Sequence, residues 1–268
     1  MIAEEKTVSP AFPYRIVRFE SLPSTNTYLS ALAREGEKEG LVVLASSQSE
    51  GKGRLSRRFY SPAGTGVYMS LLLRPTFASA LFPLLTAMAG TAAAEAAEAL
   101  SGKRIGIKWV NDLYLEGKKI AGILAESGVT QNVNCSLQNE RFVVVGIGIN
   151  LTLPASVPEE LESKMGALLT GKEFSRFPDA RERFVSLFLS HFHAYYEKMP
   201  EKAFLEGYRA RSVLEGKKVL LYGATHSEKT AAGECVTVLG VDDDGALLVL
   251  DKSGHTRSVK AGEVTLSF

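Results

Sequence analysis

The chain has 268 residues, of which 45% are hydrophobic and 23% charged, and this composition is typical of a folded globular protein. Its 31 basic and 30 acidic side chains leave a formal net charge of +1, which excludes a global attraction to nucleic acid or to a membrane surface. No stretch is continuously apolar for long enough to span a bilayer, and the N-terminus lacks the apolar core of a signal peptide. We therefore expect a cytoplasmic protein that binds anions only through local clusters.

The two cysteines, Cys135 and Cys235, lie 100 positions apart in a chain that is long enough to fold without disulfides. Disulfides are rare in the reducing cytosol. Both residues are therefore interpreted as reduced thiols.

The first part of the chain predicts strands separated by a helix and a long loop. Residues 14–20 alternate as a strand does, and a helix follows for which Ser24 is a suitable N-cap. Residues 41–47 and 67–74 predict two further strands, whereas residues 48–66 between them have no periodicity. Long aperiodic loops in compact domains are usually lids or binding loops. We therefore expect the 48–66 segment to be functional.

The middle of the chain continues the alternation of predicted strands and helices. The Ala-rich stretch 78–100 predicts a long buried helix with Pro83 near its first turn. Residues 105–109 and 118–127 predict two strands that bracket a turn-like segment at 111–117.

The remainder predicts one more strand of the first domain, a helix and a separate β module. Residues 142–151 form a strongly apolar strand, and residues 181–199 have a helical pattern. Four short apolar runs then follow, with DDDG at 242–245 as a hairpin turn. The sequence therefore predicts a large domain over 1–213 and a small SH3-like domain over 214–268.

The 48–66 loop carries a cluster of cations among glycines. Lys52, Arg54, Arg57 and Arg58 are opposed by Glu50 alone. Guanidinium groups offer a fork of donors that suits phosphate or carboxylate oxygens. The alternative is a flexible basic loop that faces water, and the charge pattern alone leaves both open.

A second cluster lies at the end of a predicted strand. Lys108 and Lys119 flank Asn111 and Asp112, so cations, an amide and a carboxylate meet where sheets commonly present their ligands. The alternative is an Asx turn with solvated lysines. The GIGIN segment at 146–150 is similarly open to interpretation as a closely packed strand end.

Five motifs together resemble those of the biotin protein ligases, in the same order. They are STN at 24–26, the basic loop that starts at Gln48, KWVND at 108–112, KKIAGIL at 118–124 and GIGIN at 146–150. The segment after residue 214 is similar to the C-terminal domain of that family. The resemblance implies an α+β fold, in which a mixed central sheet flanked by helices forms a class II synthetase-like catalytic domain, followed by a small C-terminal SH3-like β-barrel.

The resemblance also implies an activity. The enzyme would form biotinyl-5′-AMP from biotin and ATP, with Mg²⁺, and would transfer biotin to a lysine of a biotin carboxyl carrier protein, such as an acetyl-CoA carboxylase subunit. Homodimerisation is expected because members of the family often pair. DNA binding is not expected, because few residues precede the first strand.

Residue roles follow from the resemblance, position by position. The biotin-binding residues would be Ser24, Thr25, Asn26, Gln48, Gly51, Lys52, Gly53, Arg54, Lys119 and Gly122. The nucleotide-binding residues would be Arg54, Arg57, Phe59, Lys108, Asn111, Lys119 and Asn150. Lys119, Asp112 and Arg54 would be catalytic, and Asn111 would also contact Mg²⁺.

The sequence departs from the family pattern at Lys52, Ser56, Phe59 and Val110, where Arg, Gly, Trp and Pro are common. Ser56 is expected to stiffen the loop, and Phe59 offers a smaller stacking face. Two rival functions remain: a lipoate–protein ligase, which shares the fold and the adenylation chemistry, and a non-catalytic sensor of biotin or nucleotide.

Overall fold

The computed structural model describes residues 2–7, 14–130, 140–223 and 233–266, and Cys135 lies outside these ranges. Cys235 is a free cysteine, as predicted. The strands of the large sheet are β1 (Ile2–Thr7), β2 (Arg15–Leu22), β3 (Leu41–Gln48), β4 (Gly66–Leu73), β5 (Gly106–Lys108), β6 (Asp112–Leu115), β7 (Lys118–Val129) and β8 (Arg141–Asn150). The helices are α1 (Thr25–Arg34), α2 (Leu84–Ser101), α3 (Glu159–Glu162), α4 (Gly171–Arg176), α5 (Ala180–Tyr196) and α6 (Phe204–Ala210).

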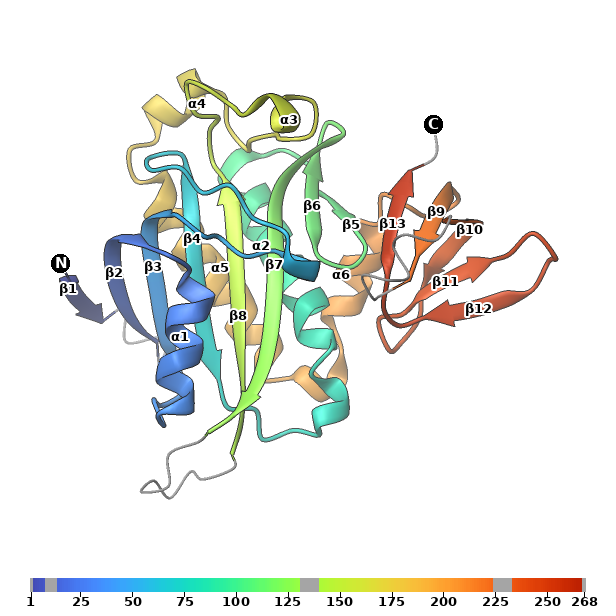
Figure 1. Cartoon of the computed structure of the whole chain (residues 1–268), viewed down its shortest axis with the longest axis horizontal. Coiled ribbons are helices and arrows are strands. Elements are labelled where there is room, and N and C mark those ends of the chain that lie inside the picture. Colours follow the sequence, from blue (N-terminus) through green and yellow to red (C-terminus); the bar gives the residue numbers. More distant parts are fainter. Residues whose placement is uncertain (1, 8–13, 131–139, 224–232, 267–268) are drawn as a thin grey trace.

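The large sheet is mixed, with the strand order β1-β2-β3-β4-β8-β7-β6-β5 (Figure 1). Strands β2 and β3 run parallel, since α1 carries the chain back between them, and the other neighbouring strands run antiparallel. The predicted mixed central sheet flanked by helices is therefore confirmed.

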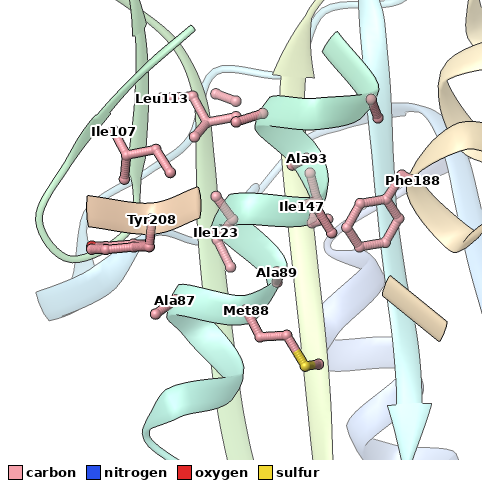
Figure 2. Packing of buried hydrophobic residues seen from close by; sticks show 14 of the residues in the cluster. Ala87, Met88, Ala89, Ala93, Ile107, Leu113, Ile123, Ile147, Phe188 and Tyr208 are labelled. Carbon is pink, nitrogen blue, oxygen red and sulfur yellow. The ribbon is translucent and has the colours of Figure 1, made fainter. Parts of the chain in front are cut away.

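Both faces of this sheet are apolar, and helices cover each of them (Figure 1). On one face, Leu29 of α1 packs in a cluster with Leu72 and Val144. On the other face, α2 lies along the sheet, and Figure 2 shows its Ala93 beside Ile147 and Phe188. All residues of β4 are buried, as expected for a central strand that is covered on both sides.

The first helix is capped as predicted, whereas the second begins later than predicted. Ser24 is the N-cap of α1, where its Oγ accepts a hydrogen bond from Thr27 N at 3.4 Å, as predicted. The second helix was predicted from Ala78, which is wrong, because α2 begins at Leu84 and Pro83 is its N-cap. The chain first makes a short 3-10 turn at Ser79–Leu81, and Pro83, which has no backbone N–H to continue a hydrogen-bonded helix, separates this turn from α2.

The segment at 111–117 was predicted to be a turn, which is wrong for most of its length. Asp112–Leu115 forms β6, which pairs with both β5 and β7. Only Glu116 and Gly117 form the turn, with φ values of 51° and 78° that suit a two-residue hairpin. The Asn-Asp pair that suggested a turn instead lies at the start of this strand, in the middle of the candidate site.

The C-terminal segment forms a five-stranded antiparallel sheet with the order β12-β11-β10-β9-β13. Its strands are β9 (Lys218–Tyr222), β10 (Glu234–Val241), β11 (Leu247–Leu250), β12 (Thr256–Val259) and β13 (Glu263–Leu266). The predicted small β module is confirmed, with the predicted turn at 242–245 between β10 and β11. The last apolar run splits into two strands near Gly262, whose φ is 150°.

The two sheets are joined by polar contacts. Trp109 Nε1 donates a hydrogen bond to Gly245 O at 3.0 Å, and Arg209 pairs with Asp243 at 2.6 Å. The small sheet is thereby held beside β5 and α6 (Figure 1). Among the helices in the described ranges, none is both long and apolar enough to cross a membrane.

Candidate active site

A cavity of about 650 Å³ opens where the 48–66 loop, strands β5 to β8 and strand β13 meet. A volume of this size is typical of small-molecule sites. The predicted site residues that line it are Ser24, Thr25, Asn26, Gln48, Lys52, Gly53, Arg54, Arg57, Phe59, Lys108, Asn111, Asp112, Lys119, Gly122 and Asn150. The structure thus brings together residues that are more than a hundred positions apart, while their individual roles stay predictions.

Gly51 is the predicted site residue that does not line this cavity. Its carbonyl oxygen accepts a hydrogen bond from Phe59 N at 2.7 Å, which closes the loop on itself. A Cβ atom at this position would lie 2.3 Å from Phe59 O. Gly51 therefore permits a close approach of two backbone segments. It affects the cavity only through the shape of the loop.

The basic loop folds over the cavity, with Arg54 turned inward. Arg54 Nη1 donates to Asn111 Oδ1 at 3.3 Å, and its Nη2 donates to Gly262 O at 3.1 Å. Arg57 forms an ion pair with Glu263. Leu55 and Ser56 have φ values of 56° and 60°, a region that glycine enters more easily than other residues. The solvated-loop interpretation therefore fails for Arg54, whereas the side chains of Lys52, Arg57 and Arg58 remain exposed.

Lys119 and Asp112 form an ion pair on adjacent strands at the floor of the cavity. Lys119 Nζ lies 2.6 Å from Asp112 Oδ1 and 5.9 Å from the centre of the Phe59 ring. Asn111 is anchored beside them, since its side-chain Nδ2 donates to Ile123 O at 3.0 Å and its backbone carbonyl oxygen accepts from Ile123 N. These contacts across the strands replace the solvated Asx turn that the sequence left open.

The cavity has a strongly positive lining, although the chain as a whole is almost neutral. Its basic residues are Lys52, Arg54, Arg57, Arg58, Lys108, Lys119 and Lys164, whereas the acids among its described lining residues are Asp112 and Glu263. Burial lowers the pKa of the Lys108 ammonium below its ordinary value, against the attraction of Asp112. Burial likewise lowers the pKa of the Arg54 guanidinium. This cluster of cations, of which Lys108 and Arg54 are partly desolvated, favours an anionic ligand.

The other end of the cavity is neutral and polar. Gln48 Oε1 accepts hydrogen bonds from Thr25 N at 2.8 Å and from Thr25 Oγ1 at 3.1 Å, and Gln48 Nε2 donates to Ser61 Oγ at 3.0 Å. Ser70 Oγ lies 2.6 Å from Asn26 Oδ1. The cavity therefore combines a cationic end with an end that suits an uncharged polar group.

Glycines on β8 let other groups lie directly against the sheet. A Cβ atom at Gly148 would be 2.4 Å from the Phe59 ring, and one at Gly146 would be 2.0 Å from Asn26 Oδ1. The GIGIN segment is thus a closely packed strand end, as one interpretation held, and it also lines the cavity. Asn150 at its end is 4% exposed, and its Oδ1 has no hydrogen-bond partner among the described residues.

Several lining or supporting residues were not identified from the sequence. Ser61, Ser70 and Glu126 join the polar network, yet a single serine or glutamate gives no local sequence signal of such contacts. Glu263 on β13 reaches the cavity from the second sheet. Only the three-dimensional contact between the two sheets reveals that contribution.

Comparisons with known proteins agree with this geometry. Residues 18–150 match the Biotin/lipoate A/B protein ligase family, and residues 232–267 match the Biotin protein ligase C terminal domain. The Bifunctional ligase/repressor BirA of Bacillus subtilis is 31% identical over 243 residues, which are 89% of this chain and 70% of the relative.

Two further proteins are similar over most of their length. The biotin–(acetyl-CoA-carboxylase) ligase of Mycobacterium tuberculosis is 30% identical over 90% of this chain and 85% of its own. The structure of a biotin protein ligase from Aquifex aeolicus in complex with biotin and ATP superposes with a TM-score of 0.73 and 26% identity, covering 96% of this chain and 99% of that one. The chain therefore belongs to the biotin protein ligases of the biotin/lipoate protein ligase family.

Proposed function

We propose that this chain is an ATP-dependent ligase that forms biotinyl-5′-AMP and transfers biotin to a lysine of a biotin carboxyl carrier protein. The observation that carries the proposal is the Lys119–Asp112 pair, which lies in one cavity between a neutral polar end and a cluster of cations. Family membership and the likeness to a ligase solved with biotin and ATP support it.

Biotin would occupy the neutral end of the cavity. Its ureido ring carries a carbonyl and two N–H groups, and each of them would cost about 1–3 kcal/mol if it were buried without a partner. Thr25 and Gln48 offer such partners at the cavity wall. The carboxylate of biotin would then point toward Lys119, at the cationic end.

ATP would occupy the cationic end. In the first step the carboxylate of biotin attacks the α-phosphate and pyrophosphate leaves, so that two anions must approach each other. Lys119 and Arg54 would neutralise the developing charge, and Arg57 would hold the phosphates, which lowers the barrier by positioning and electrostatics. Phe59 and Asn150 are proposed to contact the nucleoside.

The residues present fit Mg²⁺ as a partner of the nucleotide. Mg²⁺ prefers oxygen ligands and is usually held by one or two protein groups together with phosphates. Asn111 Oδ1 is an oxygen of that kind beside Asp112, and the described residues hold no cluster of three or more His, Cys, Asp or Glu that would form a cage. When bound, the ion would neutralise phosphate charge.

In the second step the amine of the acceptor lysine attacks the adenylate carbonyl. A lysine amine is protonated at neutral pH and must lose its proton before it attacks. Asp112 Oδ1 would hold this amine and accept its proton, since its present partner Lys119 would by then face the adenylate. The new amide bond forms, AMP leaves with the electrons of the broken acyl–phosphate bond, and the second proton of the attacking amine is released to solvent.

The acetyl-CoA carboxylase subunit is the proposed acceptor, because a relative with 30% identity is a biotin–(acetyl-CoA-carboxylase) ligase. We also propose that the catalytic domain ends at residue 213. Homodimerisation, cytoplasmic location and the absence of DNA binding stay predictions.

Exchange of labelled pyrophosphate into ATP tests the proposal, with biotin and lipoate offered in separate reactions. Exchange that depends on biotin is expected. Exchange with lipoate alone would favour the lipoate–protein ligase, and binding of biotin with no exchange and no transfer to an acceptor domain would favour the non-catalytic sensor.

A further inference from the structure

The amide of Asn26 is locked in one orientation at the neutral end of the cavity. Its Nδ2 donates to Glu126 Oε2 at 2.9 Å and to Leu124 O at 3.3 Å. A carboxylate and a backbone carbonyl can only accept, so both amide hydrogens are committed to them. The Oδ1 atom must then face Ser70, and Asn26 has no donor left for a ligand.

The hydroxyl of Ser70 is fully buried, and its single proton is shared between two acceptors. Its Oγ lies 2.6 Å from Asn26 Oδ1 and 2.8 Å from Thr25 Oγ1. Ser70 itself is 0% exposed, so water cannot take over this contact. Because Asn26 Oδ1 can only accept, the Ser70 hydroxyl must be the donor in its contact with Asn26.

The hydroxyl proton of Thr25 is directed away from the cavity. Thr25 Oγ1 donates to Gln48 Oε1 at 3.1 Å. Gln48 in turn is held in one orientation, because its Nε2 donates to Ser61 Oγ and Ser61 Oγ donates to Phe59 O at 2.9 Å. A hydroxyl has one proton and two lone pairs, so Thr25 has a lone pair and no proton to offer a ligand.

We propose that Ser70 and Glu126 are positioning residues that set the hydrogen-bond polarity of this end of the cavity, so that Thr25 meets its ligand only as an acceptor. The inference rests on the proposed function. A ureido ring presents N–H donors to such a site, whereas the dithiolane ring of lipoate has none. Because a site with an unpaired polar group rejects a ligand that lacks the matching donor, this network selects biotin over lipoate.

The test compares biotin with an analogue in which one ureido nitrogen is methylated, in the pyrophosphate-exchange assay. Separate analogues methylated at each nitrogen identify the one that faces Thr25. The wild-type enzyme is expected to lose roughly tenfold or more in kcat/KM with that analogue, as the loss of one buried hydrogen bond predicts. Ser70→Ala should raise KM for biotin about tenfold with little change in kcat, and should reduce the penalty for methylation.

Glu126 is tested through two variants, one that removes the acceptor oxygens and one that keeps an acceptor oxygen. Glu126→Leu removes the acceptor that holds Asn26 and should raise KM for biotin, whereas Glu126→Gln keeps an acceptor oxygen and should raise it less. Thr91→Val is the matched control, because it removes a fully buried hydroxyl that bonds Ala87 O and Phe204 O, outside the cavity lining.

The outcomes separate this inference from the proposed function. A wild-type KM and an unchanged methylation penalty in Ser70→Ala would overturn the inference alone, provided that the wild-type enzyme uses biotin. Equal losses for biotin and ATP in Ser70→Ala would indicate a structural role and would also overturn it. Absence of exchange with biotin in the wild-type enzyme would overturn both.

Discussion

Lys119 Nζ lies 2.6 Å from Asp112 Oδ1, so the cation proposed for adenylate formation and the carboxylate proposed for biotin transfer form one ion pair. Asp112 lies opposite Gly122 in the register of β6 and β7, and the missing side chain leaves room for Lys119, since a Cβ atom at Gly122 would lie 3.2 Å from Lys119 Nζ. The two chemical steps would thus share one location on the sheet.

Replacing Lys119 by alanine is expected to abolish adenylate formation, since the cavity loses the cation nearest to the attacking carboxylate. Removal of a group that stabilises developing charge typically lowers the rate by about 100- to 1000-fold. Single-turnover formation of biotinyl-5′-AMP measures this loss. Lys118→Ala is the matched control, because the neighbouring lysine is exposed and does not line the cavity. Normal turnover in Lys119→Ala would show that its role is misassigned.

Replacing Arg54 by glycine is expected to weaken retention of the adenylate. The variant loses the hydrogen bonds to Asn111 and Gly262 that hold the loop over the cavity. Activated biotin should then escape and modify other amines, which the labelling of a bystander protein measures. Arg54→Lys keeps the charge without the fork of donors and should have an intermediate effect. Bystander labelling no higher than with the wild-type enzyme would contradict this assignment.

Adding a methyl group at Gly148 should displace the Phe59 ring, because the new Cβ would lie 2.4 Å from it. We expect Gly148→Ala to raise KM for ATP several-fold. If the ring is the cause, the effects of Gly148→Ala and Phe59→Ala should not add in the double variant. Gly171→Ala is the control, since no atom lies within 4 Å of the place that its new Cβ would occupy. Strict additivity of the two changes would refute the proposed contact.

The affinity for ATP should depend on pH through Lys108. Burial lowers the pKa of this group below its ordinary value of 10.5, so it loses its charge at a lower pH than a free lysine does. KM for ATP should therefore rise as the pH increases through the lowered pKa. Lys108→Arg should shift this rise to higher pH, and identical pH profiles of the two enzymes would count against a nucleotide contact.

The same shift has a consequence for stability. Between the lowered pKa and 10.5 the unfolded chain binds more protons than the folded one, so the contribution of Lys108 to the free energy of unfolding increases with pH in that window. Lys108→Met should remove this dependence, which denaturant unfolding at several pH values measures.

Strands and motif residues could be predicted from the sequence because their signals are local. The strands around 41–47 and 142–151 are runs of apolar residues, and the basic loop stands out by charge and glycine. The start of α2 and strand β6 were missed. The residues before Pro83 can form either an α-helix or a 3-10 turn, and an Asn-Asp pair can either form a turn or begin a strand. Tertiary contacts, and not the local sequence, decide between these alternatives.

The supporting residues of the site could not be predicted for a different reason. Ser70 looks like any small residue in a buried strand, and its importance arises from its distance to Thr25 and Asn26, which lie far away in the sequence. Glu263 reaches the cavity only because the small sheet docks through contacts such as that of Trp109 with Gly245.

The most direct test of the central claim is a crystal structure of the protein soaked with biotin and ATP. We expect one biotinyl-5′-AMP molecule with its ureido ring at Thr25, its phosphate beside Lys119, and Arg54 closed over it. A ligand bound elsewhere, or one that leaves Lys119 and Arg54 on opposite sides without contact, would refute the proposed site.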